Sequence, residues 1–112
     1  MIEKIVRDYL LTALESIPVY VQLPKTLADT YVSIERTAGT ITDHIRRATI
    51  AVQSVSPTML GAIELHERVI AAMMEINSLD EIGAISLNSN YNFTDGDTGT
   101  YRYQAVFDLV YY

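Results

Sequence analysis

Apolar side chains recur at spacings of three and four along the first part of the chain. This period places them on one face of an amphipathic helix over residues 2–17. Pro18 ends the helix, because a proline disfavours helical geometry in the residue before it. The predicted apolar stripe consists of Ile2, Ile5, Val6, Tyr9, Leu10, Ala13, Leu14 and Ile17.

The next part of the chain alternates between apolar and polar positions, which is typical of strands. The segment VYVQLP, residues 19–24, predicts a short strand that ends at its proline or lies at a sheet edge. TYVSIERTAG, residues 30–39, predicts a second strand that Gly39 breaks, and the loop TAGTITDH follows as far as His44. A third strand is expected over about residues 45–55, and the last two strands together predict an antiparallel hairpin.

A second helix is predicted over about residues 57–77. Ser56 followed by Pro57 indicates its start, with the serine as N-cap and the proline in the first helical position. His66 stands between glutamates in ELHER and is expected on the solvated face of this helix. The predicted buried stripe consists of Ala62, Leu65, Val69, Ala72, Met73 and Ile76, whereas Glu64, Glu67, Arg68 and Glu75 lie largely outside it.

The last third predicts two more alternating strands, AISLNSNYNF and TYRYQAVFDLVYY, over residues 84–93 and 100–112. The segment between them, TDGDTGT, carries two aspartates one residue apart and looks at first like a calcium loop. A helix–loop–helix calcium loop that starts at Asp95 requires glycine at position six and glutamate at position twelve, where this chain has Thr100 and Val106. The segment is therefore predicted to be a hairpin tip built from turn-forming residues.

The order of these elements is α-β-β-β-α-β-β, which predicts a single α+β domain over residues 1–112. It would have two layers, with a mostly antiparallel sheet of about four to five strands and two helices packed on one face. The opposite face of the sheet would be partly open, polar and only weakly charged, which suits a wet protein–protein contact. Its expected residues are Ser33, Glu35, Thr37, Arg47, Thr49, Gln53, Asn88, Asn90, Arg102 and Gln104.

The composition excludes several classes of function. The chain has no cysteine, which excludes disulfide scaffolds, thiolate zinc sites and cysteine catalysis. Its formal net charge of −6 argues against a nucleic-acid binder, which needs a basic patch. No apolar run approaches the length of a membrane span, and no signal peptide is visible. No metal-binding or phosphate-binding motif occurs, so neither a metal nor a cofactor is expected.

One catalytic alternative stays open at Asp43 and His44. A neighbouring aspartate and histidine in a loop are compatible with acid–base chemistry in a small enzyme or a ligand-binding domain. No nucleophile motif such as GxSxG accompanies them. We therefore favour a surface or interface loop at this position and expect no enzyme.

Three blocks of the chain resemble the tail terminator (tail completion) proteins of long-tailed phages and prophages. The blocks are YVSIERTAG, RRATIAVQSVSPTMLGAIELHERVIAAM and NSNYNFTDGDTGTYRYQAVFDLVYY. The resemblance implies a non-enzymatic protein that forms a ring, usually a hexamer, at the head-proximal end of the tail tube. Such a ring stops tube polymerisation and gives the head connector a surface to join.

The partners that this resemblance implies are further copies of the chain, the tail tube protein and head–tail connector or neck proteins. The site of action would be a virion tail assembled in the cytoplasm of a bacterial host. DNA would pass through the lumen without sequence-specific binding, and the acidic balance of the chain would line the ring without gripping that DNA. No membrane partner is implied. Another head–tail joining or neck protein of the same virion is the alternative within this class.

Subunit or tube contacts are expected in the ERTAG turn, in the loop after it, at the hairpin tip and at the chain end. The alternative for Glu35 and Arg36 is a cross-strand ion pair inside one subunit. The alternative for Tyr111 and Tyr112 is packing into the sheet of their own subunit. The candidate interface residues are Glu35, Arg36, Thr37, Asp43, His44, Asp95, Asp97, Arg102, Gln104, Tyr111 and Tyr112.

Overall fold

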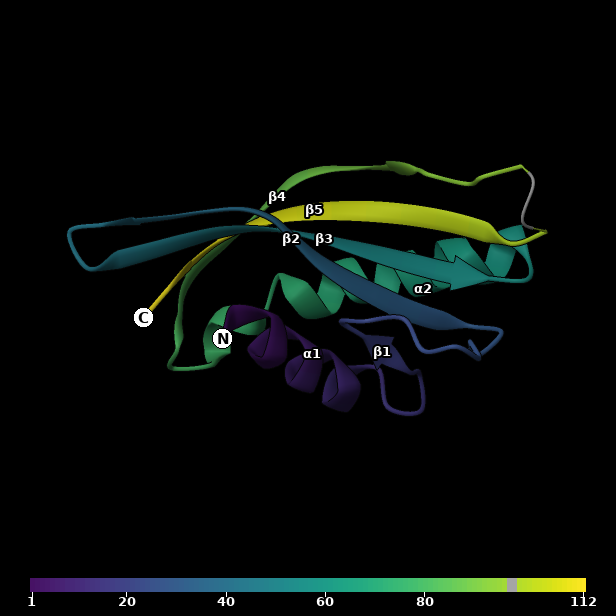
Figure 1. Ribbon diagram of the computed structural model, residues 1–112, viewed down its shortest axis with the longest axis horizontal. Helices are drawn as coiled ribbons and strands as arrows, with labels where there is room; N and C mark the ends of the chain where they lie inside the picture. Colours follow the sequence, from purple (N-terminus) through teal and green to yellow (C-terminus); the bar gives the residue numbers. More distant parts are fainter. Residues whose placement is uncertain (97–98) are drawn as a thin grey trace.

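A computed structural model describes residues 1–96 and 99–112, with two helices and a five-stranded sheet (Figure 1). The architecture and the order of elements confirm the predicted α+β class. The helices are α1, Ile2–Ala13, and α2, Met59–Met73, and a short 3-10 turn, η1, spans Ile76–Ser78. The strands are β1, Val19–Tyr20; β2, Tyr31–Thr42; β3, Ile45–Ser56; β4, Ile82–Asn92; and β5, Tyr101–Tyr111.

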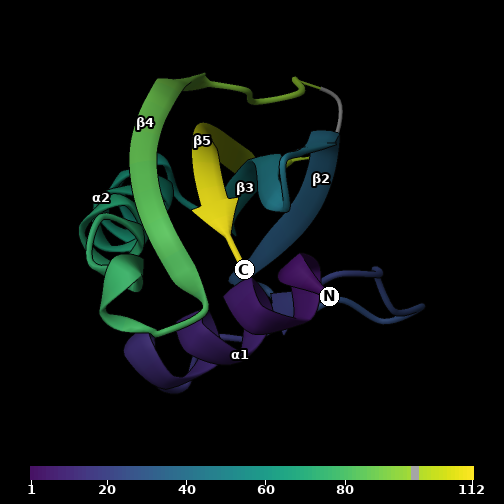
Figure 2. The same ribbon diagram turned by 90° about the vertical axis from the view of Figure 1, so that its left-hand side faces the viewer.

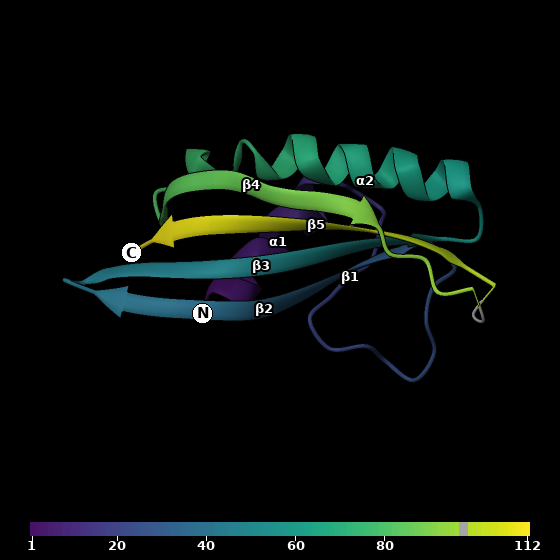
Figure 3. The same cartoon turned by 90° about the horizontal axis from the view of Figure 1, so that it is seen from above.

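The sheet has the strand order β1-β2-β3-β5-β4, so the last strand of the chain lies between β3 and β4 (Figure 3). Neighbouring strands are antiparallel except β1 and β2, which run parallel, so the sheet is mixed. β1 is shorter than predicted, because only Val19 and Tyr20 pair with β2. The chain leaves the sheet before Pro24, which has no backbone N–H to donate to a neighbouring strand.

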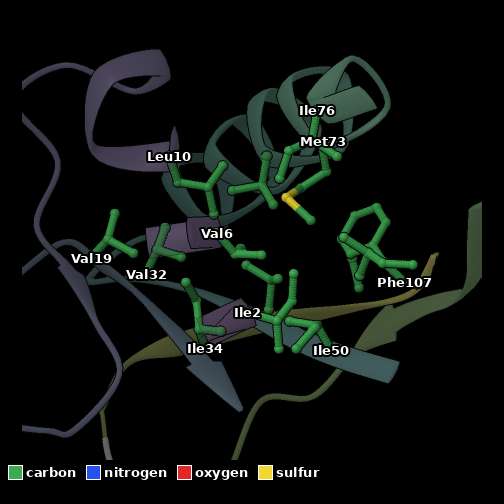
Figure 4. Close-up of a cluster of buried hydrophobic side chains, with 14 of the residues drawn as sticks. Ile2, Val6, Leu10, Val19, Val32, Ile34, Ile50, Met73, Ile76 and Phe107 are labelled. Carbon is green, nitrogen blue, oxygen red and sulfur yellow. The ribbon is translucent and has the colours of Figure 1, made fainter. Parts of the chain in front are cut away.

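Both helices pack on one face of the sheet, and the hydrophobic core lies between the two layers (Figure 2). Figure 4 shows the side chains of Ile2, Val6 and Leu10 from α1 and Met73 from α2 gathered with Phe107 of β5. None of these five side chains is more than 1% exposed. The apolar periods seen in the sequence are therefore the faces that build the core.

The first helix is shorter than predicted. It ends at Ala13 rather than at Ile17, although the N–H of Leu14 still donates to the carbonyl of Leu10 at 2.8 Å. Glu15 has a φ of 57°, in the left-handed region that a right-handed helix cannot contain. The helix therefore stops one turn before the proline that was expected to end it.

The second helix starts later than predicted, and Ser56 is not its N-cap. Ser56 is the last residue of β3, where it pairs with Tyr101, so its backbone is extended. The N-cap is Thr58, whose hydroxyl oxygen accepts a hydrogen bond from the N–H of Gly61 at 3.0 Å. Pairing of β3 with β5 thus determines where the helix begins.

The segment predicted as a loop over residues 37–44 is mostly strand. β2 continues through Gly39, which pairs with Ala48, and ends at Thr42. A glycine weakens a strand, but the backbone pairing along the hairpin keeps this one extended. The result is a long β2–β3 hairpin in place of two short strands and a loop.

Three bulges change which side chains face the helices. The register shifts at Thr37 in β2 and at Gly83 and Asn88 in β4, each time by one extra residue. Because side chains alternate with a period of two, every residue beyond a bulge changes face. Asn90 therefore pairs with the buried Ala105 and turns toward α2, whereas the sequence predicted it on the open face.

The prediction that His66 lies on a solvated helix face is wrong. Its side chain is 5% exposed and lies between α2 and the sheet. Nε2 of His66 is 3.2 Å from Oδ1 of Asn90, and the imidazole ring is 5.2 Å from the ring of Tyr103. The buried face of α2 therefore includes His66 in addition to the predicted apolar stripe, because this histidine lies against Asn90 of β4.

Replacing Phe107 by alanine is expected to lower the free energy of unfolding by about 3–5 kcal/mol, because the ring is fully buried in the core. Urea denaturation followed by circular dichroism measures this loss. Phe93→Ala is the matched control, because Phe93 is 46% exposed and should lose less than about 1 kcal/mol. Equal losses for the two variants would contradict the position of the core.

Replacing Asn90 by alanine is expected to cost about 1–2 kcal/mol, because it leaves Nε2 of the buried His66 without its hydrogen-bond acceptor. Asn88→Ala is the control, since the amide of Asn88 donates to Asp108 on the open face and not to a buried side chain, and it should cost less than about 1 kcal/mol. Urea denaturation of both variants tests the bulge. A larger loss for Asn88→Ala would mean that the register is different.

Candidate assembly surfaces

Side-chain hydrogen bonds cross the open face of the sheet from β2 to β4. The amide nitrogen of Gln53 donates to Oε1 of Gln104 at 2.9 Å, and the amide nitrogen of Gln104 donates to the hydroxyl of Tyr91. At the other end of this row, the hydroxyl of Ser33 donates to Oε1 of Gln53 at 3.5 Å. Gln104, a candidate interface residue, is thus already bonded within its own chain.

A second row centres on Asp108, which the sequence analysis did not single out. One carboxylate oxygen accepts a hydrogen bond from the hydroxyl of Thr49 at 2.8 Å, and the other accepts one from the amide of Asn88 at 3.0 Å. The signal was a lone acid within an apolar strand, because such a side chain must point away from the core or find a partner. These bonds hold the carboxylate in place on the open face.

The open face is hollowed near the base of the arm-forming β2–β3 hairpin, between residues of β2, β3, β4 and β5. The hollow has a volume of about 440 Å³. Most of its lining side chains are small, and its charged members are Arg47 and Asp108. Its lining contains no histidine or lysine, so the arrangement suits contact with a protein segment better than acid–base chemistry. The lining residues are Ala38, Gly39, Thr40, Arg47, Ala48, Thr49, Ala84, Ile85, Ser86, Asp108, Leu109 and Val110.

The distal part of the β2–β3 hairpin, residues 35–47, extends past the helices and is called the arm (Figure 1). All of its side chains are exposed, and Ile41 is 73% exposed. Nε of Arg36 is 3.5 Å from a carboxylate oxygen of Glu3, so this arginine ties the base of the arm to α1. The ion pair that Arg36 forms within its own chain therefore joins the sheet to α1, and it is not the cross-strand pair that the sequence left open.

The arm contains three further candidate residues. Its tip is the two-residue turn Asp43-His44, with φ angles of 52° and 66°. Positive φ at both positions is what a tight type I′ turn requires. Thr37 lies at the bulge, and its hydroxyl donates to the carbonyl of Thr49 at 3.4 Å. The ERTAG segment is thus a bulged strand and not a turn.

The β4–β5 hairpin, which carries further candidates, closes at the opposite end of the sheet (Figure 1). Arg102 and Thr94 close the β4–β5 hairpin, because the N–H of Arg102 donates to the hydroxyl of Thr94 at 3.0 Å. The guanidinium carbon of Arg102 is 5.7 Å from the ring centroid of Phe93, within range of a cation–π contact. Asp95 is exposed there, and Asp97 lies outside the described residues.

The chain end packs on its own sheet. Tyr111 pairs with Arg46 and with Ile82 and packs against the core. The N–H of Tyr112 donates to the carbonyl of Glu81 at 2.9 Å. The candidate residues therefore form two groups at opposite ends of a molecule that is 45 Å long, and they do not make a single site.

The catalytic alternative at Asp43 and His44 gains no support from the geometry. Both side chains lie at the exposed tip of the arm, and the hollow on the sheet face is lined by neither. Across residues 1–96 and 99–112, no three histidine, aspartate or glutamate side chains are grouped to hold a metal ion.

No helix in the same part of the chain is long and apolar enough to cross a membrane.

Comparisons with known proteins identify a solved structure with a similar fold but no family with a similar sequence. No protein family and no curated protein sequence matches the chain. Among solved structures, it is similar to a chain of the virion of a native gene transfer agent (GTA) particle, with a TM-score of 0.66 and 14% identity. The aligned part covers 91% of this chain and 83% of that chain. At this identity, the similarity concerns the fold.

Replacing His44 by glycine is expected to stabilise the chain by up to about 1 kcal/mol, because glycine adopts the positive φ of this turn position without strain. Urea denaturation measures the change. Thr42→Gly is the matched control one strand position before the turn, and it should destabilise by roughly 0.5–1 kcal/mol. Destabilisation by both variants would argue against the tight turn.

Proposed function

We propose that this chain is a structural protein of a phage-like virion that forms a ring at the head-proximal end of the tail tube. There it stops tube polymerisation and provides the surface that the head joins. A virion role is supported by the fold that 91% of this chain shares with a chain of a gene transfer agent particle. The terminator role in particular is supported by the three sequence blocks that resemble tail terminator proteins.

The described surface supports assembly better than catalysis. The polar side chains in the middle of the open face are bonded to one another, so they form a rigid polar surface rather than a reactive group. A closed ring needs two different patches on each subunit, since every contact joins unlike surfaces. We assign the subunit and tube contacts to the candidates at the two ends of the sheet, which are Glu35, Arg36, Thr37, Asp43, His44, Tyr111 and Tyr112 at one end and Asp95, Arg102 and Gln104 at the other.

The partners of the ring are then the tail tube protein and head–tail connector proteins, in a virion tail assembled in the cytoplasm of a bacterial host. DNA passes through the lumen without being gripped, which the net charge of −6 favours. A cryo-EM ring with a basic lumen would contradict this part of the proposal. Binding of the purified chain to tail tube ends, and not to the portal complex, separates a terminator from another neck protein.

The mass of the purified chain in solution tests the ring. Native mass spectrometry or light scattering after gel filtration should give a closed assembly near six times 12.6 kDa. A monomer at every concentration would contradict self-assembly into a ring.

Arg36→Ala should reduce ring formation and leave the circular dichroism spectrum unchanged, because Arg36 lies exposed at the base of the arm. Glu3→Gln is the matched control, since it weakens the same ion pair within the chain and leaves Arg36 in place. Gel filtration of both variants decides between an interface role and an internal one. If Glu3→Gln impaired the ring as much as Arg36→Ala, the arginine would act by holding the arm on α1.

A further inference from the structure

Two adjacent cations of the arm have no ionic partner within the described chain. Arg46 and Arg47 are both exposed, and no salt bridge joins either of them to residues 1–96 or 99–112. The third arginine of the arm, Arg36, is held by Glu3. In a chain with 14 acidic and 8 basic residues, the arm carries three arginines against two acidic residues, Glu35 and Asp43.

The two cations point to opposite faces of the arm. Arg46 shares a face with its cross-strand partner Ile41, because directly paired residues lie on the same side of a sheet. Arg47 lies on the other face, beside Thr40 in the lining of the hollow. The face with Ile41 and Arg46 therefore combines an exposed apolar side chain with an unpaired positive charge.

The outward side of α2 has the complementary composition. Exposed residues follow one another there at spacings of four and three, which places them in one row, called the α2 stripe. The middle of the row is acidic and its ends are apolar, with Leu60 being 67% exposed. The neighbouring cation Arg68 donates to the carbonyl of Leu14 at 3.2 Å and forms no salt bridge with a described glutamate. The α2 stripe consists of Leu60, Glu64, Glu67, Ala71 and Met74.

The arm and the α2 stripe lie on opposite flanks of the molecule. β2 and β4 are on opposite sides of the β3–β5 pair, and α2 lies on the β4 side in both end and top views (Figures 2 and 3). The arm of a chain therefore cannot dock on the α2 stripe of the same chain. Two complementary patches on opposite flanks of one chain are what a contact between unlike surfaces of successive copies requires.

We propose that the arm of one copy docks on the α2 stripe of the next copy, with Arg46 against Glu64 and Glu67 and Ile41 against an apolar end of the stripe. This contact rests on the proposed ring and adds the outward side of α2 to the surfaces through which the subunits meet. Opposite charges orient the two copies and speed their encounter, while burial of Ile41 removes apolar surface from water. Because the charges are exposed before docking, high salt should weaken the ring.

Charge reversal on each surface tests the contact. Arg46→Glu and Glu67→Arg, each purified alone, should require an at least about ten-fold higher concentration to form rings, because each places like charges together. Mixed in equal amounts, the two variants should form rings again, since every arm then meets an α2 stripe of opposite charge. With one variant labelled with nitrogen-15, native mass spectrometry should find equal numbers of both chains in each ring.

Arg47→Glu is the matched control, because it makes the same charge change one residue along the strand, on the other face of the arm. Its rings should form within about three-fold of the wild-type concentration. If the Arg46→Glu variant formed rings at the wild-type concentration, or if the mixture failed to restore rings, this contact would be overturned and the proposed function would stand. A wild-type chain that stays monomeric would overturn the ring itself and this contact with it.

Discussion

The pairing of β3 with β5 is the contact on which the rest of the structure depends. It runs without a register shift from Arg46 opposite Tyr111 to Ser56 opposite Tyr101, and it joins the middle of the chain to its end. One face of the pair carries Phe107 under the helices, and the other carries the polar rows. Because β2 and β4 attach on either side, the core and the open face both require the last strand, a long-range contact that is slow to form in folding.

Irregularity is confined to the strands on either side of that pair. The bulges at Thr37 in β2 and at Gly83 and Asn88 in β4 interrupt the regular backbone ladder. A bulged strand is a poor template for pairing with a strand of another chain. The open face contributes a rigid polar surface, because its hydrogen bonds cross from strand to strand.

The charges of the surface are arranged so that one chain cannot neutralise them by itself. The arginines of the arm and the acidic outer side of α2 lie on opposite flanks of the molecule, and the core holds both in place. Arg36 is neutralised within the chain by Glu3, whereas Arg46 has no such partner among the described residues. Substitutions on these surfaces are therefore expected to leave the packed core, and with it the fold, unchanged.

The sequence by itself determined the α+β class, the order of the elements and the hairpin tip around Asp95, because periods of two and of three to four are local properties of the chain. The sequence also indicated most of the candidate surface residues, but not which of them lie close together. Only the tertiary structure turned Asn90 toward α2, because the position of a bulge depends on how the strand pairs with its neighbour. It also buried His66, because the sheet residues that pack on a helix determine how much of the helix surface is buried. The antiparallel pairing of β3 with β5 likewise placed the tips of the two hairpins at opposite ends of the sheet. Packing of α1 on the sheet joined Arg36 to Glu3, a contact between segments far apart in sequence that exists only after folding.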